Sequence, residues 1–132
     1  MQAADDAGLE AFATERYLNL ETYRRDGTAV RTPVWFAAAG EALYVYSTAE
    51  SGKAKRIRRH GVAKIAPCDM RGKVTGPWVD VAAMLVHGEE FAQGMRLLDR
   101  KYFPWKQLLG LGRLFRPTTH VVIALRPAVS AR

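Results

Sequence analysis

A run of basic side chains is the clearest chemical feature of this 132-residue sequence. The seven residues from Lys53 to Arg59, KAKRIRR, carry five positive charges and no acid. Just before the run, Ser51 suits a helix N-cap and Gly52 lets another group approach the backbone. A helix start offers free amides and the positive end of the helix dipole, which together attract an anion such as phosphate. The pattern therefore predicts a phosphate site at this helix start.

Lys53 and Arg56 are the side chains expected to bind that phosphate. They are three residues apart and so share one face of the helix, where both can form charge-assisted hydrogen bonds. The competing interpretation is a solvated basic helix face. Lys55, Arg58 and Arg59 point in other directions and fit either that interpretation or contact with the acidic tail of a longer ligand.

Composition bounds the function without choosing it. A net charge of +7 favours an anionic partner, which can be a phosphorylated cofactor, a nucleic acid or a membrane surface. The length and 48% apolar residues predict one domain over residues 1–132 with one core. A single cysteine, Cys68, allows no internal disulfide, and three scattered histidines predict no metal site. With an acidic N-terminal segment and no long apolar stretch, we expect a soluble cytoplasmic protein that does not bind membranes.

Alternating apolar residues and β-branched composition predict an antiparallel barrel. An Asp26-Gly27 turn joins the first two strands as a hairpin, because these residues tolerate positive φ. The expected strands are Tyr17–Arg25, Thr28–Ala38, Ala42–Thr48, Val62–Cys68, Lys73–Val86 and Thr119–Leu125.

Helices are expected between and before these strands. A short basic helix follows Ser51 and ends near Gly61, and an amphipathic helix spans Glu89–Tyr102. Pro104 can begin a further helix through Phe115, whose Trp105–Phe115 segment we interpret as docking on the barrel or on a dimer partner. The residues up to about Thr14 are expected to form a short helix leading into the barrel.

The first three strands are apolar on both faces, which predicts a partner. A barrel has one interior to fill, so outward residues such as Trp35, Tyr44 and Tyr46 would leave an exposed apolar patch. A two-fold homodimer would cover that patch.

Three segments carry a family resemblance: VRTPVWF at Val30–Phe36, YVYSTAESGKAKRIR at Tyr44–Arg58 and VAKIAPCDMRG at Val62–Gly72. They resemble the cofactor-binding half of the pyridoxamine-phosphate-oxidase-like proteins, most closely a branch thought to use the deazaflavin F420. The resemblance implies a mainly β fold, the FMN-binding split barrel, with a Greek-key-like antiparallel sheet and flanking helices. It also implies an oxidoreductase that transfers hydride to or from a small organic substrate, with F420 favoured and FMN as the alternative. Each coenzyme would lie between the subunits of a homodimer.

The resemblance also assigns cofactor-binding roles to individual residues. Arg31 takes the place of an arginine that reaches the coenzyme phosphate, and the main chain of Thr32, Pro33 and Val34 lies along the ring system. Ser47 and Thr48 match a pair of hydroxyl side chains. Ser51, Gly52 and Lys53 match the phosphate loop, with Arg56 one turn further on. No residue is assigned as a catalytic acid or base, because hydride chemistry belongs to the coenzyme.

Two alternatives stay open at the level of sequence. The first is a basic β-barrel that binds nucleic acid, since positive charge with aromatic residues is also the pattern of a single-strand-binding surface. We disfavour it because the basic residues cluster at one helix start. The second is a protein that binds the coenzyme without turnover. The C-terminal sequence ALRPAVSAR lacks the arginine and histidine signature of true pyridoxamine-phosphate oxidases, which argues against vitamin B6 synthesis.

Overall fold

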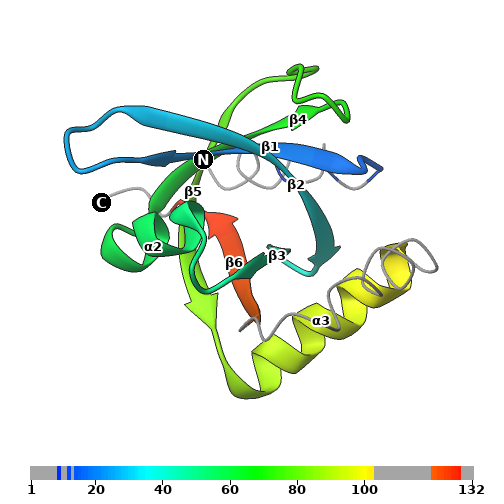
Figure 1. Ribbon diagram of the computed structural model, residues 1–132. Coiled ribbons are helices and arrows are strands. Elements are labelled where there is room, and N and C mark those ends of the chain that lie inside the picture. Colours follow the sequence, from blue (N-terminus) through cyan, green and yellow to red (C-terminus); the bar gives the residue numbers. More distant parts are fainter. Residues whose placement is uncertain (1–8, 10–11, 13, 103–119, 129–132) are drawn as a thin grey trace.

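The computed structural model describes residues 9, 12, 14–102 and 120–128. Its strands close into one antiparallel barrel in the order β1-β2-β3-β6-β5-β4 (Figure 1). Because β4 returns beside β1 and β6 lies beside β3, the connections are Greek-key-like, and the predicted mainly β fold is confirmed. In chain order the elements are β1 (Tyr17–Tyr23), β2 (Ala29–Ala39), β3 (Ala42–Thr48), α2 (Gly52–Arg59), β4 (Val62–Cys68), β5 (Val79–Val86), α3 (Gly88–Tyr102) and β6 (His120–Pro127).

Alternate side chains of the strands fill the barrel. In β3, Leu43 and Val45 point into the main core while Tyr44 points outward, as the period of two in a strand requires. Ile123 and Leu125 of β6 join the same core and are fully buried. Burying side chains of this size contributes about 1.5 to 3 kcal/mol each. The alternation in the sequence therefore identified the inward faces of both strands.

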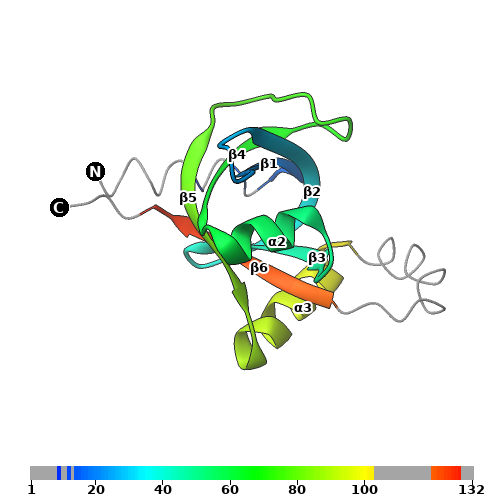
Figure 2. The same cartoon turned by 60° about the vertical axis from the view of Figure 1, so that its left-hand side comes forward.

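Helix α2 lies across one end of the barrel (Figure 2). Ala54 and Ile57 are its buried residues, and Ile57 packs in the same core as the inward strand residues. The predicted basic helix is thus confirmed, with its apolar face closing the barrel. Its other side chains, mostly basic, lie at the surface around that end.

Helix α3 packs outside the barrel against β2, β3 and β6 (Figures 1 and 2). Gly94 permits close contact, because a Cβ there would lie 2.9 Å from Cγ1 of Val122. At the end of the helix, the Tyr102 hydroxyl accepts a hydrogen bond from the Phe36 N–H and lies 2.7 Å from the carbonyl oxygens of Phe36 and Arg16. Burial raises the pKa of Tyr102 to about 12, so this hydroxyl keeps its proton.

The outward strand residues that suggested a dimer find cover within one chain. Tyr44 is only 4% exposed beneath α3, and the ring of Trp35 stacks on Tyr102 with 4.7 Å between centroids. Tyr46 packs in the same outer cluster as Trp35 and Leu98. The expected apolar patch is therefore smaller than the sequence suggested, because Tyr44 is covered while Trp35 and Tyr46 stay partly exposed, and the homodimer stays a prediction.

Two predicted boundaries also differ from the structure. The first turn spans residues 24–28, because the Arg24 N–H donates to the Thr28 carbonyl and Gly27 takes a φ of 89°. Strand β5 begins at Val79 and not at Lys73, since Pro77 has no N–H to donate to a ladder. Before it, Val74 forms only an isolated bridge with Cys68.

The predicted helix over Pro104–Phe115 and most of the expected N-terminal helix lie outside the described residues. Within the described part of the chain, no helix combines the length and apolar character needed to cross a membrane.

Candidate anion site at the start of α2

The closed barrel has a short ladder between β2 and β3, and beyond it the two strands leave an opening between their unpaired edges. The two strands pair only from Phe36 opposite Val45 to Ala39 opposite Ala42, while residues 29–35 of β2 pair with β1 alone among the described elements. If the pairing continued, Val34 would face Ser47 and Pro33 would face Thr48. Unpaired strand edges present free backbone N–H and C=O groups to a ligand. The predicted ring-binding segment Thr32–Val34 and the predicted hydroxyl pair therefore border the same opening.

The start of α2 lies next to this opening, and hydrogen bonds define its geometry. The Ser51 Oγ accepts from the Ala54 N–H at 3.2 Å, so Ser51 is the N-cap, as predicted. The same hydroxyl lies 2.8 Å from the Ser47 Oγ, and the Ser51 N–H donates to the Thr48 carbonyl at 3.1 Å. The structure thus brings Ser47, Thr48 and Ser51 together at the end of β3.

Arg56 folds back over the first turn of α2. Its Nε donates to the Thr22 Oγ1 at 2.7 Å, and its guanidinium lies so close to Gly52 that a Cβ there would be 2.6 Å from Nη1. Gly52 therefore provides space for the Arg56 side chain, a more specific role than the close approach of a ligand that the sequence suggested. Thr22 is 1% exposed, so the hydroxyl that orients Arg56 is itself held in the core.

Lys53 has no acidic partner among the described residues. Burial lowers its pKa, and repulsion from Arg56 lowers it further. The pKa of Arg56 is lowered in the same way, by burial first and then by the charges of Arg24 and Arg59. Positive charge is therefore concentrated at this end of the barrel without neutralisation, which is the electrostatic condition for binding an anion.

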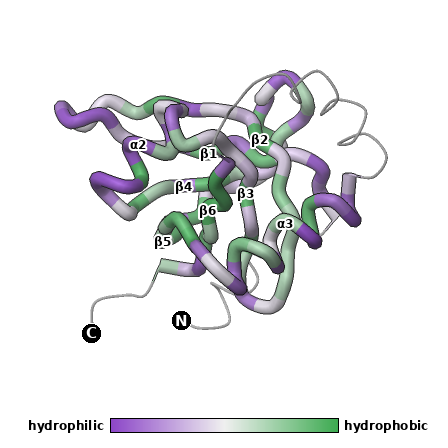
Figure 3. The backbone as a smooth tube through the Cα atoms, turned by 60° about the horizontal axis from the view of Figure 1, so that its bottom comes forward, coloured by the Kyte–Doolittle hydropathy of each residue, from purple (hydrophilic) through white to green (hydrophobic). Residues whose placement is uncertain are grey.

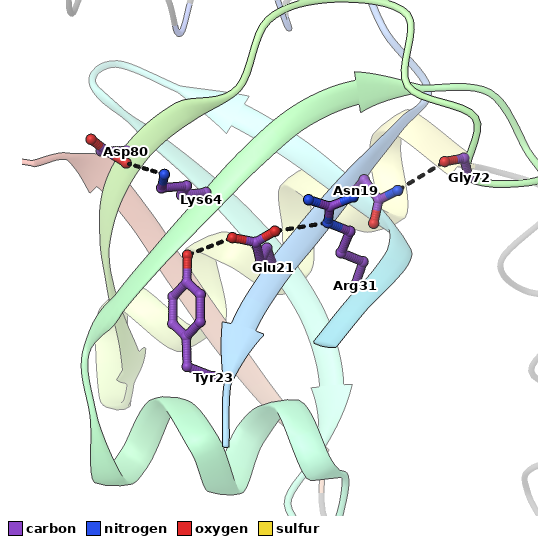
Figure 4. Close-up of polar contacts among 7 residues, drawn as sticks. All are labelled: Asn19, Glu21, Tyr23, Arg31, Lys64, Gly72 and Asp80. Carbon is purple, nitrogen blue, oxygen red and sulfur yellow. Dashed lines mark hydrogen bonds and ion pairs between the residues drawn. The ribbon is translucent and has the colours of Figure 1, made fainter. Parts of the chain in front are cut away.

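Arg31 lies in a different environment, on the outer face of β1 and β2 (Figure 4). Its Nε donates to the Glu21 Oε1 at 2.7 Å, directly across the two strands, and its guanidinium stacks 4.7 Å from the Trp78 ring centroid. Its side chain is nevertheless 57% exposed, so the remaining N–H groups can still donate to a ligand. Its predicted phosphate role stays a prediction, and no contact joins Arg31 to the start of α2.

Glu21 is a buried carboxylate that the sequence analysis missed. Burial alone would raise its pKa, but hydrogen bonds from Tyr23, at 2.6 Å, and from Arg31 outweigh burial and lower the pKa. Its signal in the sequence is an acidic residue at an outward position of a strand whose inward residues include Leu18 and Leu20. Beside it, Asn19 donates to the Gly72 carbonyl at 2.8 Å, so the loop between β4 and β5 covers this face. The Asn19 Oδ1 is buried without a partner.

The site supplies binding groups and no acid-base pair. In the part of the chain described above, no cluster of three or more histidine, cysteine or acidic side chains could hold a metal ion. What the site offers is a capped helix start, two adjacent cations and two open strand edges. These groups can bind a phosphate and hold a flat ring system beside it.

Comparison of the fold with solved structures gives clear matches. A proposed pyridoxamine 5'-phosphate oxidase from Listeria innocua aligns with a TM-score of 0.68 at 18% identity, covering 96% of this chain and 94% of that one. An F420 reductase aligns at 0.58 and 23% identity, covering 91% and 93%. The heme storage protein HutZ of Vibrio cholerae aligns at 0.66 and 14% identity, covering 95% and 91%.

This chain has the pyridoxamine-phosphate-oxidase-like split-barrel fold. The expected fold is therefore confirmed. The sequence itself matches no protein-family model and no curated protein. At these identities the likeness concerns the fold alone, and the fold serves both redox enzymes and heme-binding proteins.

Proposed function

We propose that this protein binds F420, with FMN as the alternative coenzyme, and transfers hydride to or from a small organic substrate. The observation that carries the proposal is the pair Lys53 and Arg56 at the capped start of α2, partly buried and without an acidic partner among the described residues. Both coenzymes carry a phosphate group that would use these cations.

The residues present fit such a coenzyme. Lys53 keeps a charge that burial and Arg56 both disfavour, and a bound phosphate would relieve that cost. Arg56 is already oriented by Thr22, so little rotamer freedom would be lost on binding. The open edges at Thr32–Val34 and Ser47–Thr48 offer main-chain and hydroxyl groups for the ring. Arg31, positioned by Glu21, would add a further cation.

The protein's own part in the reaction would be binding and orientation. The coenzyme, when bound, supplies the two-electron hydride chemistry. Lys53 and Arg56 would fix the phosphate end, and the strand edges would fix the ring. By holding both ends of the coenzyme, these groups would orient it for transfer to the substrate. A homodimer with the coenzyme between its subunits stays part of the proposal, and sedimentation with and without coenzyme tests it.

Nucleic-acid binding is less well supported by the geometry. Single-strand-binding surfaces stack bases on exposed aromatic rings. Here Tyr44 is buried, Trp35 stacks on Tyr102, and Arg31 already stacks on Trp78. These rings are therefore not free platforms beside the basic residues.

A titration followed by fluorescence or absorbance tests the proposal. We expect both F420 and FMN to bind, F420 more tightly, and Lys53→Met to weaken binding about 10- to 150-fold, the scale of a lost charge-assisted hydrogen bond. Lys55→Met removes the same charge from an exposed position of α2 and serves as the matched control in the titration with FMN, which has no acidic tail to contact Lys55; its FMN affinity should stay within about twofold of the wild type. Equal losses of coenzyme affinity in Lys53→Met and Lys55→Met would refute the phosphate site at Lys53. The absence of binding of either coenzyme would refute the proposed function.

A further inference from the structure

A second basic concavity lies at the other end of α2. It is a groove of about 840 Å³ between the β1–β2 turn, the C-terminal end of α2 and the edges of β4 and β5. Its cationic lining consists of Arg24, Arg25, Arg59 and Lys64, with His60 beside them. None of the residues predicted to bind the coenzyme phosphate or ring lines it; of the residues considered for contact with an acidic tail, only Arg59 does. At about 1.5 Å per residue, the eight residues of α2 separate it from Ser51 by roughly 12 Å.

The charges in this groove converge from separate segments. Figure 3 shows the hydrophilic turn between β1 and β2 on the same side of the molecule as α2. Arg59 bridges the two, because its Nη2 donates to the Tyr23 carbonyl at 3.0 Å. Arg24 and Arg59 are close enough to Arg56 to lower its pKa by repulsion. These exposed charges are screened by water and salt, but together they would attract an anion into the space between them.

Neutralisation within the groove is weak. Asp80 is its only acidic lining residue among those described, and its Oδ1 lies 3.9 Å from the Lys64 Nζ, beyond hydrogen-bond distance. Both side chains are largely exposed, so the pair contributes little (Figure 4). No ion pair within 4 Å joins the three arginines of the groove to a described acidic residue, and the charge of Asp26 in the same turn offsets that of Arg24 only in part.

The floor of the groove is apolar. Val62, which is 48% exposed, is its accessible apolar side chain, while Ala63 and Val81 also line it but belong to the buried core. Small-molecule sites typically measure about 300 to 1,000 Å³ and combine apolar walls with a few polar groups that orient the ligand. The groove falls within that range and suits a compact ligand better than an extended chain.

We propose that this groove binds a small organic polyanion, a ligand with an apolar body and at least two anionic groups. The apolar body would lie on Val62, while its anionic groups would contact the arginines of the turn and of α2. The site is independent of the coenzyme proposal, because Lys53 does not line it.

Fluorescence anisotropy with pyrenetetrasulfonate, a polyanion with a flat apolar body, tests the proposal on the full chain. We expect Arg59→Ala, and Arg24→Ala with Arg25→Ala, each to weaken binding at least about tenfold, as expected for a lost charge-assisted contact. Arg58→Ala is the matched control, since it removes the same group one residue away from an exposed position outside the groove lining. It should leave the affinity within about twofold. Thermal melts verify that each variant is folded.

The outcomes separate this site from the coenzyme site. Lys53→Met should retain probe binding, so failure of the coenzyme proposal leaves this one standing. Equal losses for Arg58→Ala and Arg59→Ala would mean diffuse charge attraction and would overturn the proposal, as would no binding of the probe. A single-stranded oligonucleotide that binds more tightly than the probe and displaces it would also overturn it, in favour of a nucleic-acid surface.

Discussion

Two cationic regions of this barrel differ in how their charge is balanced. On the outer face of β1 and β2, Arg31 lies against the buried Glu21 and the ring of Trp78. At the start of α2, Lys53 and Arg56 lie beside each other with no acidic partner among the described residues. The first arrangement satisfies a buried carboxylate, while the second holds positive charge that a bound anion would neutralise.

The difference shows that the number of basic residues alone does not locate an anion site. Arg31 and Lys53 were both predicted to bind phosphate, yet one already has a structural partner and the other does not. Removing Arg31 should therefore affect folding first, whereas removing Lys53 should affect ligand binding first.

Arg31→Met is expected to have the largest effect, a loss of folding stability. It leaves the Glu21 carboxylate buried with Tyr23 as its remaining side-chain donor, which should lower the free energy of unfolding by about 1 to 3 kcal/mol. Urea unfolding measures the change. Adding Glu21→Leu to Arg31→Met should recover most of the loss, because the unpaired buried charge is then gone. If Arg31→Met is as stable as the wild type, the ion pair between Arg31 and Glu21 has no structural role.

A smaller effect is expected when the pH changes the affinity for the coenzyme. Burial and Arg56 place the pKa of Lys53 below its ordinary value of 10.5, so Lys53 loses its charge at a lower pH than an exposed lysine. Coenzyme affinity should therefore fall as the pH rises through that lowered pKa, by at most about tenfold per pH unit. The Lys53→Arg variant should not lose coenzyme affinity over the same pH range, because arginine stays protonated. Identical pH profiles for the two proteins would show that the charge of Lys53 does not contribute to binding.

The sequence predicted α2 and its surroundings well because the signals there are local. A serine cap, a basic run and two inward apolar residues, Ala54 and Ile57, all lie within one short segment. The approach of Ser47 and Thr48 to Ser51 followed from the short connection between β3 and α2. Their proposed roles in binding rest on resemblance and stay predictions.

The partnership of Arg31 with Glu21 could not be predicted in the same way, since it depends on register. A two-residue turn at Asp26-Gly27 would pair Glu21 with Thr32. The wider turn over residues 24–28 shifts the register by one and places Glu21 opposite Arg31. Likewise, no local pattern shows that α3 covers Tyr44, because that contact joins segments distant in the chain. The groove beside Arg59 also combines residues from distant segments.

Urea unfolding of the wild type and Lys53→Met, each with and without F420, tests the central claim most directly. The folded state lowers the pKa of Lys53, so its charged form is disfavoured on folding, and the free variant should be at least as stable as the wild type. Coenzyme at 100 times its dissociation constant should stabilise the wild type by about 2.7 kcal/mol. The variant should lose at least about half of that gain, because a tenfold weaker affinity removes about 1.4 kcal/mol. A variant that is less stable when free, yet gains as much from F420 as the wild type, would contradict the claim that Lys53 is an unpaired cation held for a ligand.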